Sequence, residues 1–127
     1  MAPTVLIVDD DRTFLSFLSR TLKRGGFHVL EASDGSEVPE VLSSHDVDIL
    51  LLDLLMPGVS GWEVLRSLNR VALEASVSAK RPKVVVVSAR DEDDTVAFVR
   101  RLGAAAYLTK PLRGEQVLRT VRRVLMH

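Results

Sequence analysis

The sequence predicts an α/β fold: a single doubly wound (βα)5 domain with a parallel sheet covered by helices on both faces. Five short apolar runs alternate with five segments of helical periodicity, an order typical of parallel sheets joined by right-handed crossovers. The first and fourth runs, and the third run from Ile49 onward, are continuously apolar, as expected for strands buried on both faces. A chain of 127 residues fits one domain, which we expect to span residues 1–127 without a separate output domain.

Each apolar run is followed by a helical stripe, which gives five strand-then-helix units in series. The runs expected as strands are Val5–Val8, Phe27–Leu30, Val47–Leu52, Val84–Val87 and Ala104–Leu108. The stripes with helical spacing cover residues 14–22, 38–42, 62–72, 96–102 and 117–125.

Capping and breaking residues mark the ends of the first three helices. Gly25-Gly26 closes the first helix. Pro39 fits the second helix if that helix begins at about Ser36, where the backbone N–H groups have no helical partner. Ser60–Glu63 has the pattern of a capping box that opens the third helix.

Similar signals bound the fourth helix. Asp91 is the expected N-cap, acidic residues fill the first turn, and Gly103 follows the last turn. Between the third helix and the fourth strand, the Glu74–Pro82 segment is less periodic and is expected to be a longer helix end followed by a loop.

Composition excludes several classes of protein. The chain has no cysteine, so disulfides and cysteine-based metal or redox sites are absent. Seventeen basic residues balance 17 acidic ones, so no net field favours direct binding to nucleic acid or to a membrane. No apolar stretch approaches the roughly 20 residues that span a bilayer. We expect a cytoplasmic protein.

Polar side chains follow the apolar runs at the points where the strands end. Asp9 and Asp10 follow the first run, Asp53 follows the third, Ser88 the fourth, and Lys110 comes just after the fifth. Because the carboxyl ends of parallel strands share one edge of the sheet, we expect these side chains to converge in one crevice. Asp11 is expected to cap the first helix or to stay solvated.

This set of side chains favours phosphoryl chemistry. Carboxylates that lie close together repel one another unless a cation lies among them. Mg²⁺ prefers a few carboxylates together with waters and phosphate oxygens. An Asp carboxylate is also a known phosphoryl-accepting nucleophile, and a lysine and a hydroxyl can neutralise and orient the transferring group.

The motifs at these strand ends resemble those of response-regulator receiver domains of two-component signalling, the CheY-like superfamily. The segments that carry the resemblance are Leu6–Asp11, Leu52–Gly61, Val87–Ala89, Gly103-Ala104 with Tyr107, and Lys110-Pro111. The resemblance covers essentially the whole chain. It implies a flavodoxin-like sheet with the strand order 2-1-3-4-5.

The resemblance also implies a phospho-acceptor switch rather than an enzyme. Asp53 would take a phosphoryl group from a histidine kinase, a histidine phosphotransfer protein or a small phosphodonor. The ligands of Mg²⁺ would be Asp9, Asp10, Asp53 and the backbone carbonyl of Leu55. Lys110 would pair with the phosphoryl group, its bond to Pro111 would be cis, Ser88 would move toward the phosphoryl oxygen, and Tyr107 would follow inward.

The expected output surface is the face formed by the fourth helix, the fifth strand and the fifth helix. Phosphorylation would shift a pre-existing equilibrium of this face and change the binding of a downstream protein or output domain. Some related regulators dimerise there through charged pairs. Gln116, Thr120 and Ala105-Ala106 depart from that charged pattern, which speaks against such a symmetric dimer and leaves a different partner open.

Two alternatives remain open from the sequence. Asp9 and Asp11 also fit the Asp-x-Asp-x-Thr pattern of haloacid-dehalogenase-type phosphohydrolases, with Asp9 as nucleophile and Asp11 as general acid/base. That family needs further acids after the lysine, where only Glu115 is found, and it leaves Asp53 without a role. The second alternative is a receiver-like module that binds partners without being phosphorylated.

Overall fold

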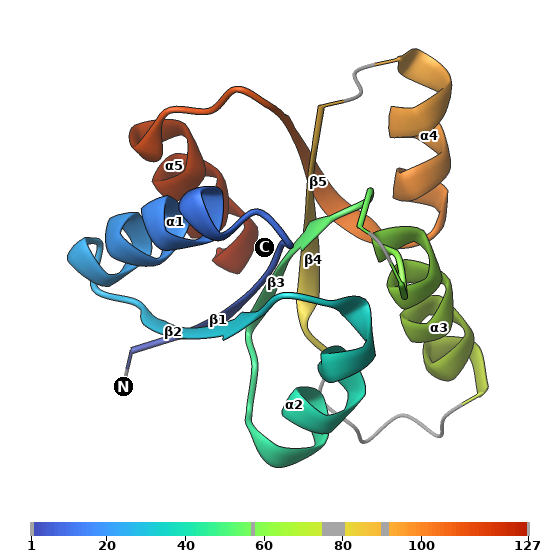
Figure 1. Ribbon diagram of the computed structural model, residues 1–127. Coiled ribbons are helices and arrows are strands. Elements are labelled where there is room, and N and C mark those ends of the chain that lie inside the picture. Colours follow the sequence, from blue (N-terminus) through green and yellow to red (C-terminus); the bar gives the residue numbers. More distant parts are fainter. Residues whose placement is uncertain (1, 57, 75–80, 90–91, 127) are drawn as a thin grey trace.

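A five-stranded parallel sheet forms the centre of the molecule, with the strand order β2-β1-β3-β4-β5 (Figure 1). The computed structural model describes residues 2–56, 58–74, 81–89 and 92–126. The strands are β1 (Thr4–Val8), β2 (His28–Ala32), β3 (Ile49–Asp53), β4 (Lys83–Ser88) and β5 (Ala104–Thr109). The helices are α1 (Arg12–Arg24), α2 (Val38–Ser44), α3 (Gly61–Glu74), α4 (Asp93–Arg101) and α5 (Gly114–Leu125), with a 3₁₀ turn η1 (Gly35–Glu37) before α2. The predicted fold class and strand order are confirmed.

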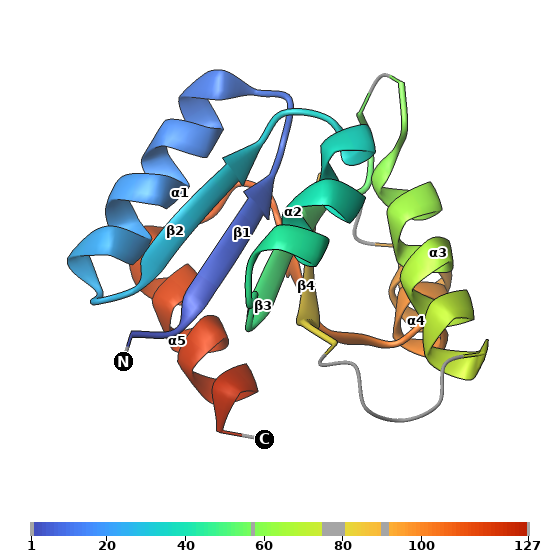
Figure 2. The same cartoon turned by 90° about the horizontal axis from the view of Figure 1, so that it is seen from below.

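Two apolar clusters, one on each face of the sheet, hold the helices in place. On one face, Leu6, Leu50 and Val86 pack with side chains of α2, α3 and α4. On the other face, Ile7 and Leu51 pack with side chains of α1 and α5. Figure 2 shows this division, with α1 and α5 on one side of the sheet and α2, α3 and α4 on the other. Both faces are buried, which explains why the central strands read as continuous apolar runs.

Two predicted strands were displaced by one or two residues from the observed ones. Phe27 was expected to begin the second strand, but its amide donates to the carbonyl of Leu22 (3.0 Å) and so belongs to the turn that ends α1. Val47 was expected to begin the third strand, which starts at Ile49. Both Phe27 and Val47 are buried, and burial alone does not distinguish a strand residue from the turn before it.

The helix signals were largely correct. The Asp11 side chain caps α1 by accepting from the amides of Thr13 and Phe14, and Gly26 follows the helix with a φ of 92°. Pro39 lies in the first turn of α2, which follows η1 rather than starting at Ser36. The Glu63 amide donates to Ser60 Oγ (3.4 Å), which is one of the two bonds of the predicted capping box.

The fourth helix begins after Glu92, whose side chain makes no capping hydrogen bond. The predicted cap, Asp91, lies outside the described residues, as does most of the Glu74–Pro82 segment. Gly103 follows α4 with a φ of 100°, as expected. In the ranges that the structure describes, no helix has both the length and the apolar character needed to span a membrane.

Gly61 fixes the approach of α3 to the end of β3. Its amide donates to the carbonyl of Leu54 (3.1 Å), and a Cβ at this position would collide with the backbone of Asp53 and Leu54. Backbone atoms at the end of a buried strand cannot rotate away as a side chain can. The first turn of α3 therefore depends on a glycine to lie this close to Asp53.

We expect Gly61→Ala to lower the free energy of unfolding by about 1–3 kcal/mol, because the added methyl group overpacks this contact. Urea denaturation followed by circular dichroism would measure the change. Ser67→Ala, at an exposed position of the same helix, is the matched control and should change stability by less than about 0.5 kcal/mol. Equal stabilities of the two variants would contradict the proposed close packing.

Candidate functional site

Polar side chains from four strands meet at the carboxyl edge of the sheet. Asp9 directly follows β1, Asp53 ends β3, Ser88 ends β4, and Lys110 directly follows β5. The Lys110 amide donates to the carbonyl of Ser88 (2.8 Å), which extends the pairing of β4 and β5 by one step. The parallel sheet therefore brings together residues that lie up to 101 positions apart in the chain.

Three carboxylates form the centre of this site. Asp9, Asp10 and Asp53 each offer an oxygen, and these oxygens all lie within 4.8 Å of one another. Asp9 is 2% exposed and Asp53 is 6% exposed, whereas Asp10 lies at the surface. The cluster therefore has two buried carboxylates on neighbouring strands and one that opens to solvent.

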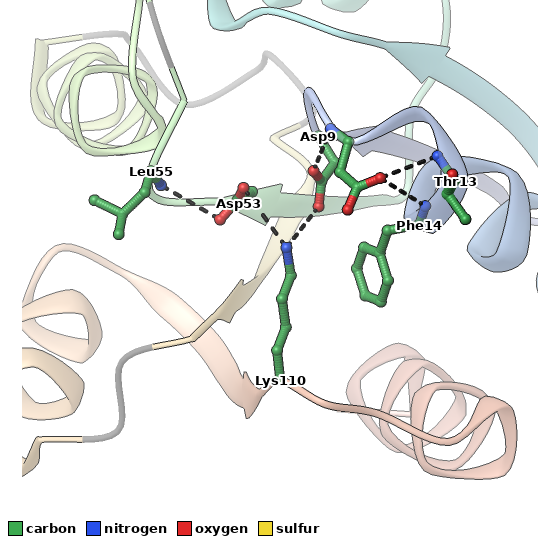
Figure 3. Close-up of polar contacts among 7 residues, drawn as sticks. Asp9, Thr13, Phe14, Asp53, Leu55 and Lys110 are labelled. Carbon is green, nitrogen blue, oxygen red and sulfur yellow. Dashed lines mark hydrogen bonds and ion pairs between the residues drawn. The ribbon is translucent and has the colours of Figure 1, made fainter.

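The Lys110 ammonium lies between the two buried carboxylates (Figure 3). Its Nζ is 3.1 Å from Asp9 Oδ2, where it donates a hydrogen bond, and 3.7 Å from Asp53 Oδ2. The Lys110 side chain is 24% exposed, so these ion pairs are only partly screened by water. The predicted cis bond between Lys110 and Pro111 is confirmed.

The Asp53 carboxyl binds a proton more tightly than an ordinary aspartate side chain does. Burial raises its pKa from the ordinary value of 3.8 to about 6. The Lys110 ammonium and the amide of Leu55 oppose this rise, and the negative charges of Asp9 and Asp10 add to it. A carboxylate in this position gains more than an exposed one from any further cation that comes close.

The loop after β3 is held at three points. The Leu55 amide donates to Asp53 Oδ1 (3.3 Å), the Gly61 amide to the Leu54 carbonyl, and the Gly35 amide to the Val59 carbonyl (3.2 Å). These bonds fix the backbone of Leu55 beside Asp53. Leu55 is 48% exposed, and its side chain points away from the carboxylates (Figure 3).

Ser88 and Tyr107 lie where the sequence predicted, on neighbouring strands beside the site. Ser88 is fully buried at the end of β4 and pairs with Thr109 of β5. Tyr107 is partly buried and packs against the cluster that holds α2, α3 and α4. Arg90, two residues after Ser88 in the sequence, lies outside the described residues.

One contact of the site was missed by the sequence analysis. The Lys110 Nζ lies 4.4 Å from the centre of the Phe14 ring, within the range of a cation–π interaction. The sequence placed Phe14 only in the apolar stripe of the first helix. Its position four residues after Asp10, in the first helical turn, was the available signal that it faces the strand ends.

The tryptophan and the histidines of the chain lie in other environments. Trp62 of α3 packs edge-to-face against Phe98 of α4, with ring centroids 5.6 Å apart, so it joins two helices rather than lining the carboxylate cluster. His28 and His45 are exposed and belong to no cluster of metal-ligand type within the described residues, while His127 lies outside them.

The sheet order and the residues at its carboxyl edge define a class of protein, the receiver domains of two-component signalling. Residues 5–122 match the family described as response regulator receiver domain, and the chain belongs to that family. It is 32% identical over 121 residues to the protein PilH of Pseudomonas aeruginosa, a match that covers 95% of this chain and 96% of PilH.

Other relatives are longer than this chain. The transcriptional regulatory protein PhoP of Bacillus subtilis is 30% identical over 98% of this chain, which spans only 49% of PhoP. Among solved structures, a response regulator from Thermotoga maritima is 26% identical with a TM-score of 0.84, and the match covers 100% of both chains. The receiver domain of a putative Luxo repressor protein from Vibrio parahaemolyticus, 21% identical, has the same fold with a TM-score of 0.88 over 99% of this chain and 92% of that one.

The raised pKa of Asp53 predicts how stability depends on pH in the metal-free protein. Between about pH 4 and pH 6 the folded protein keeps a proton on Asp53 that the unfolded chain has released, so the free energy of unfolding falls as pH rises through this window. We expect Asp53→Asn to be more stable than the wild type by about 2–3 kcal/mol at pH 7.5, with the difference lost near pH 4.

Urea denaturation of both proteins in the presence of a metal chelator, at pH values from 4 to 8, would measure this difference. Glu31→Gln, at an exposed carboxylate of the edge strand β2, is the control and should give no such gain. A wild type more stable than Asp53→Asn at pH 7.5 would show that the pairing with Lys110 outweighs the burial of Asp53.

Proposed function

We propose that this protein is a phospho-acceptor switch of a two-component phosphorelay, in which Asp53 accepts the phosphoryl group. The observation that carries the proposal is the position of Asp53: a buried carboxylate beside Asp9 and Asp10, 3.7 Å from the ammonium of Lys110. The donor would be the phosphohistidine of a histidine kinase or of a histidine phosphotransfer protein, or a small phosphodonor. Membership of the receiver family supports this assignment.

The donor set of the site fits Mg²⁺. Three carboxylates and one ammonium leave two formal negative charges at the edge of the sheet, which one divalent cation would offset. All the donors are hard oxygen atoms, as Mg²⁺ prefers. We infer that Asp10, Asp53 and the backbone carbonyl of Leu55 hold the ion, with Asp9 helping directly or through water. When bound, Mg²⁺ would supply positive charge opposite the phosphoryl oxygens.

Asp53 and Lys110 have different roles in the proposed phosphoryl transfer. An Asp53 oxygen forms the new bond to phosphorus as the bond between phosphorus and the donor nitrogen breaks, and the electron pair of that bond stays with the donor imidazole. With a pKa of about 6, the Asp53 carboxyl is mostly ionised at pH 7 and is available as a nucleophile. The Lys110 ammonium neutralises the transferring group.

The proposed output runs from the end of β4 to the face formed by α4, β5 and α5. Ser88 would donate its hydroxyl hydrogen to the phosphoryl group, and Tyr107, on the neighbouring strand, would move further inward. Binding of a downstream protein or output domain to this face would then change. With such partners the protein would act in the cytoplasm, and the proposal gives the chain no direct contact with nucleic acid or a membrane.

Two observations speak against the phosphohydrolase alternative. That mechanism needs Asp11 as a general acid/base, whereas the Asp11 carboxylate accepts the amides of Thr13 and Phe14 at the start of α1. The family match over residues 5–122 is to receiver domains. The alternative of an unphosphorylated binding module is separated from our proposal by the following experiment.

We expect the wild type to gain one phosphoryl group when incubated with acetyl phosphate and Mg²⁺, because the carboxylates hold the metal beside Asp53. Intact mass spectrometry with and without a chelator would detect the gain and its metal dependence. Asp53→Asn should take up none. Asp11→Ser is the matched control, since it removes a carboxylate from the same loop yet keeps a capping side chain, and it should still be phosphorylated.

Two results would contradict the proposal. A metal-dependent phosphoryl gain that persists in Asp53→Asn would remove Asp53 as the acceptor. Hydrolysis of small phosphate esters that is lost in Asp9→Asn but kept in Asp53→Asn would favour the phosphohydrolase mechanism. Absence of any gain in the wild type, with either acetyl phosphate or a phosphorylated histidine kinase, would favour the unphosphorylated module.

A further inference from the structure

We propose that Phe14 is a positioning residue, whose ring holds the Lys110 ammonium at the phosphoryl-accepting edge of the site. This inference rests on the proposed function, because it concerns the group that neutralises the transferring phosphoryl. Figure 3 shows the Phe14 ring beside the Lys110 side chain, on the side of α1, with the carboxylates of Asp9 and Asp53 beyond the nitrogen.

The ammonium of Lys110 has three partners within the described residues. Two are charged: Asp9 Oδ2 at 3.1 Å and Asp53 Oδ2 at 3.7 Å. The third is the face of the Phe14 ring, whose centre lies 4.4 Å from Nζ. The negative face of an aromatic ring attracts a cation, and the attraction grows when water is kept away from the contact. Lys110 is only 24% exposed, which favours this third contact.

The ring differs from the two carboxylates in one respect that matters for function. In the proposed site, Asp9 and Asp53 also serve the metal ion, and Asp53 changes its charge and shape when it accepts a phosphoryl group. Their hold on the ammonium therefore changes during the reaction. The attraction of the Phe14 ring does not depend on metal binding or on the charge of Asp53. It keeps the ammonium at the edge of the site throughout.

Both ends of this contact are anchored by the backbone. The Phe14 amide donates to the capping carboxylate of Asp11 (3.2 Å), so the backbone of Phe14 is held in the first turn of α1. On the other side, the Lys110 amide donates to the carbonyl of Ser88 (2.8 Å). The two side chains, Phe14 and Lys110, lie between these anchors, and the long lysine side chain has many rotamers that the contact can restrict.

A purely structural role of Phe14 makes a different prediction from a positioning role. If the ring only fills space, leucine should replace it with little effect on phosphorylation, and tyrosine should offer no advantage over leucine. If the ring positions Lys110, its aromatic character should matter more than its volume. The set Phe14→Leu, Phe14→Tyr and Phe17→Leu separates these possibilities. Phe17→Leu removes the ring next to Phe14, whereas among the described residues the cation–π contact of the Lys110 ammonium is with Phe14.

The initial rate of Asp53 phosphorylation by acetyl phosphate with Mg²⁺ is the first measurement. We expect Phe14→Leu to be slower than the wild type by about threefold or more, with Phe14→Tyr and Phe17→Leu within about twofold. The second measurement uses the metal-free protein: the NMR chemical shift of the Lys110 ε-methylene protons, which a ring above them moves upfield. This shift should be lost in Phe14→Leu and kept in Phe14→Tyr and Phe17→Leu.

The positioning role is overturned if Phe14→Leu phosphorylates as fast as the wild type, if Phe14→Tyr is as slow as Phe14→Leu, or if Phe17→Leu reproduces the loss. An ε-methylene shift that Phe14→Leu leaves unchanged overturns the contact itself. Failure of the proposed function has a different signature. In that case the wild type takes up no phosphoryl group at Asp53, and the positioning role fails with it, even if the NMR shift shows that the ring contacts Lys110.

Discussion

The burial of two carboxylates at the end of an apolar sheet is the constraint on which the site depends. Asp9 directly follows β1, and Asp53 ends β3. These two strands are hydrogen-bonded neighbours, so the two carboxylates cannot separate unless the strands do. A buried charge is costly unless it is paired. Lys110 supplies the cation from the far side of β4, held there by its backbone bond to Ser88. The position of the loop after β5 is therefore set by electrostatics as well as by packing.

The parallel sheet also explains why most residues of the site could be predicted from the sequence. Parallel strands place their carboxyl ends at one edge, so polar residues that end separate apolar runs have to meet there. Asp9, Asp10, Asp53 and Lys110 meet as predicted, and Ser88 ends the strand beside them. The fold class followed from the same alternation of runs and stripes. The chemical roles of these residues rest on the proposal, since proximity does not by itself establish a transfer.

Of the two parts that sequence reasoning missed, one depends on a tertiary contact and the other on a local turn. Helical periodicity places Phe14 in the apolar stripe of α1. It does not predict the orientation of a ring in the first helical turn after α1 has packed on the sheet. Phe27 was assigned to a strand because it is apolar, although its amide completes the turn after α1. In both cases the residue type was read correctly as buried or partly buried. The ring of Phe14 contacts Lys110, which lies far away in the sequence, whereas the amide of Phe27 bonds to the nearby carbonyl of Leu22.

The backbone hydrogen bond between Lys110 and Ser88 gives the proposed switch a physical basis. Ser88 ends β4 and Lys110 follows β5, and a backbone hydrogen bond joins them. The two side chains that would contact a phosphoryl group are thus tied to adjacent strands, and β5 also carries Tyr107. A change of charge at Asp53 acts on Lys110 through space, and Lys110 cannot shift its backbone without disturbing the end of β4. The strand pair that borders α4 and α5 is therefore the element best placed to respond to the state of Asp53.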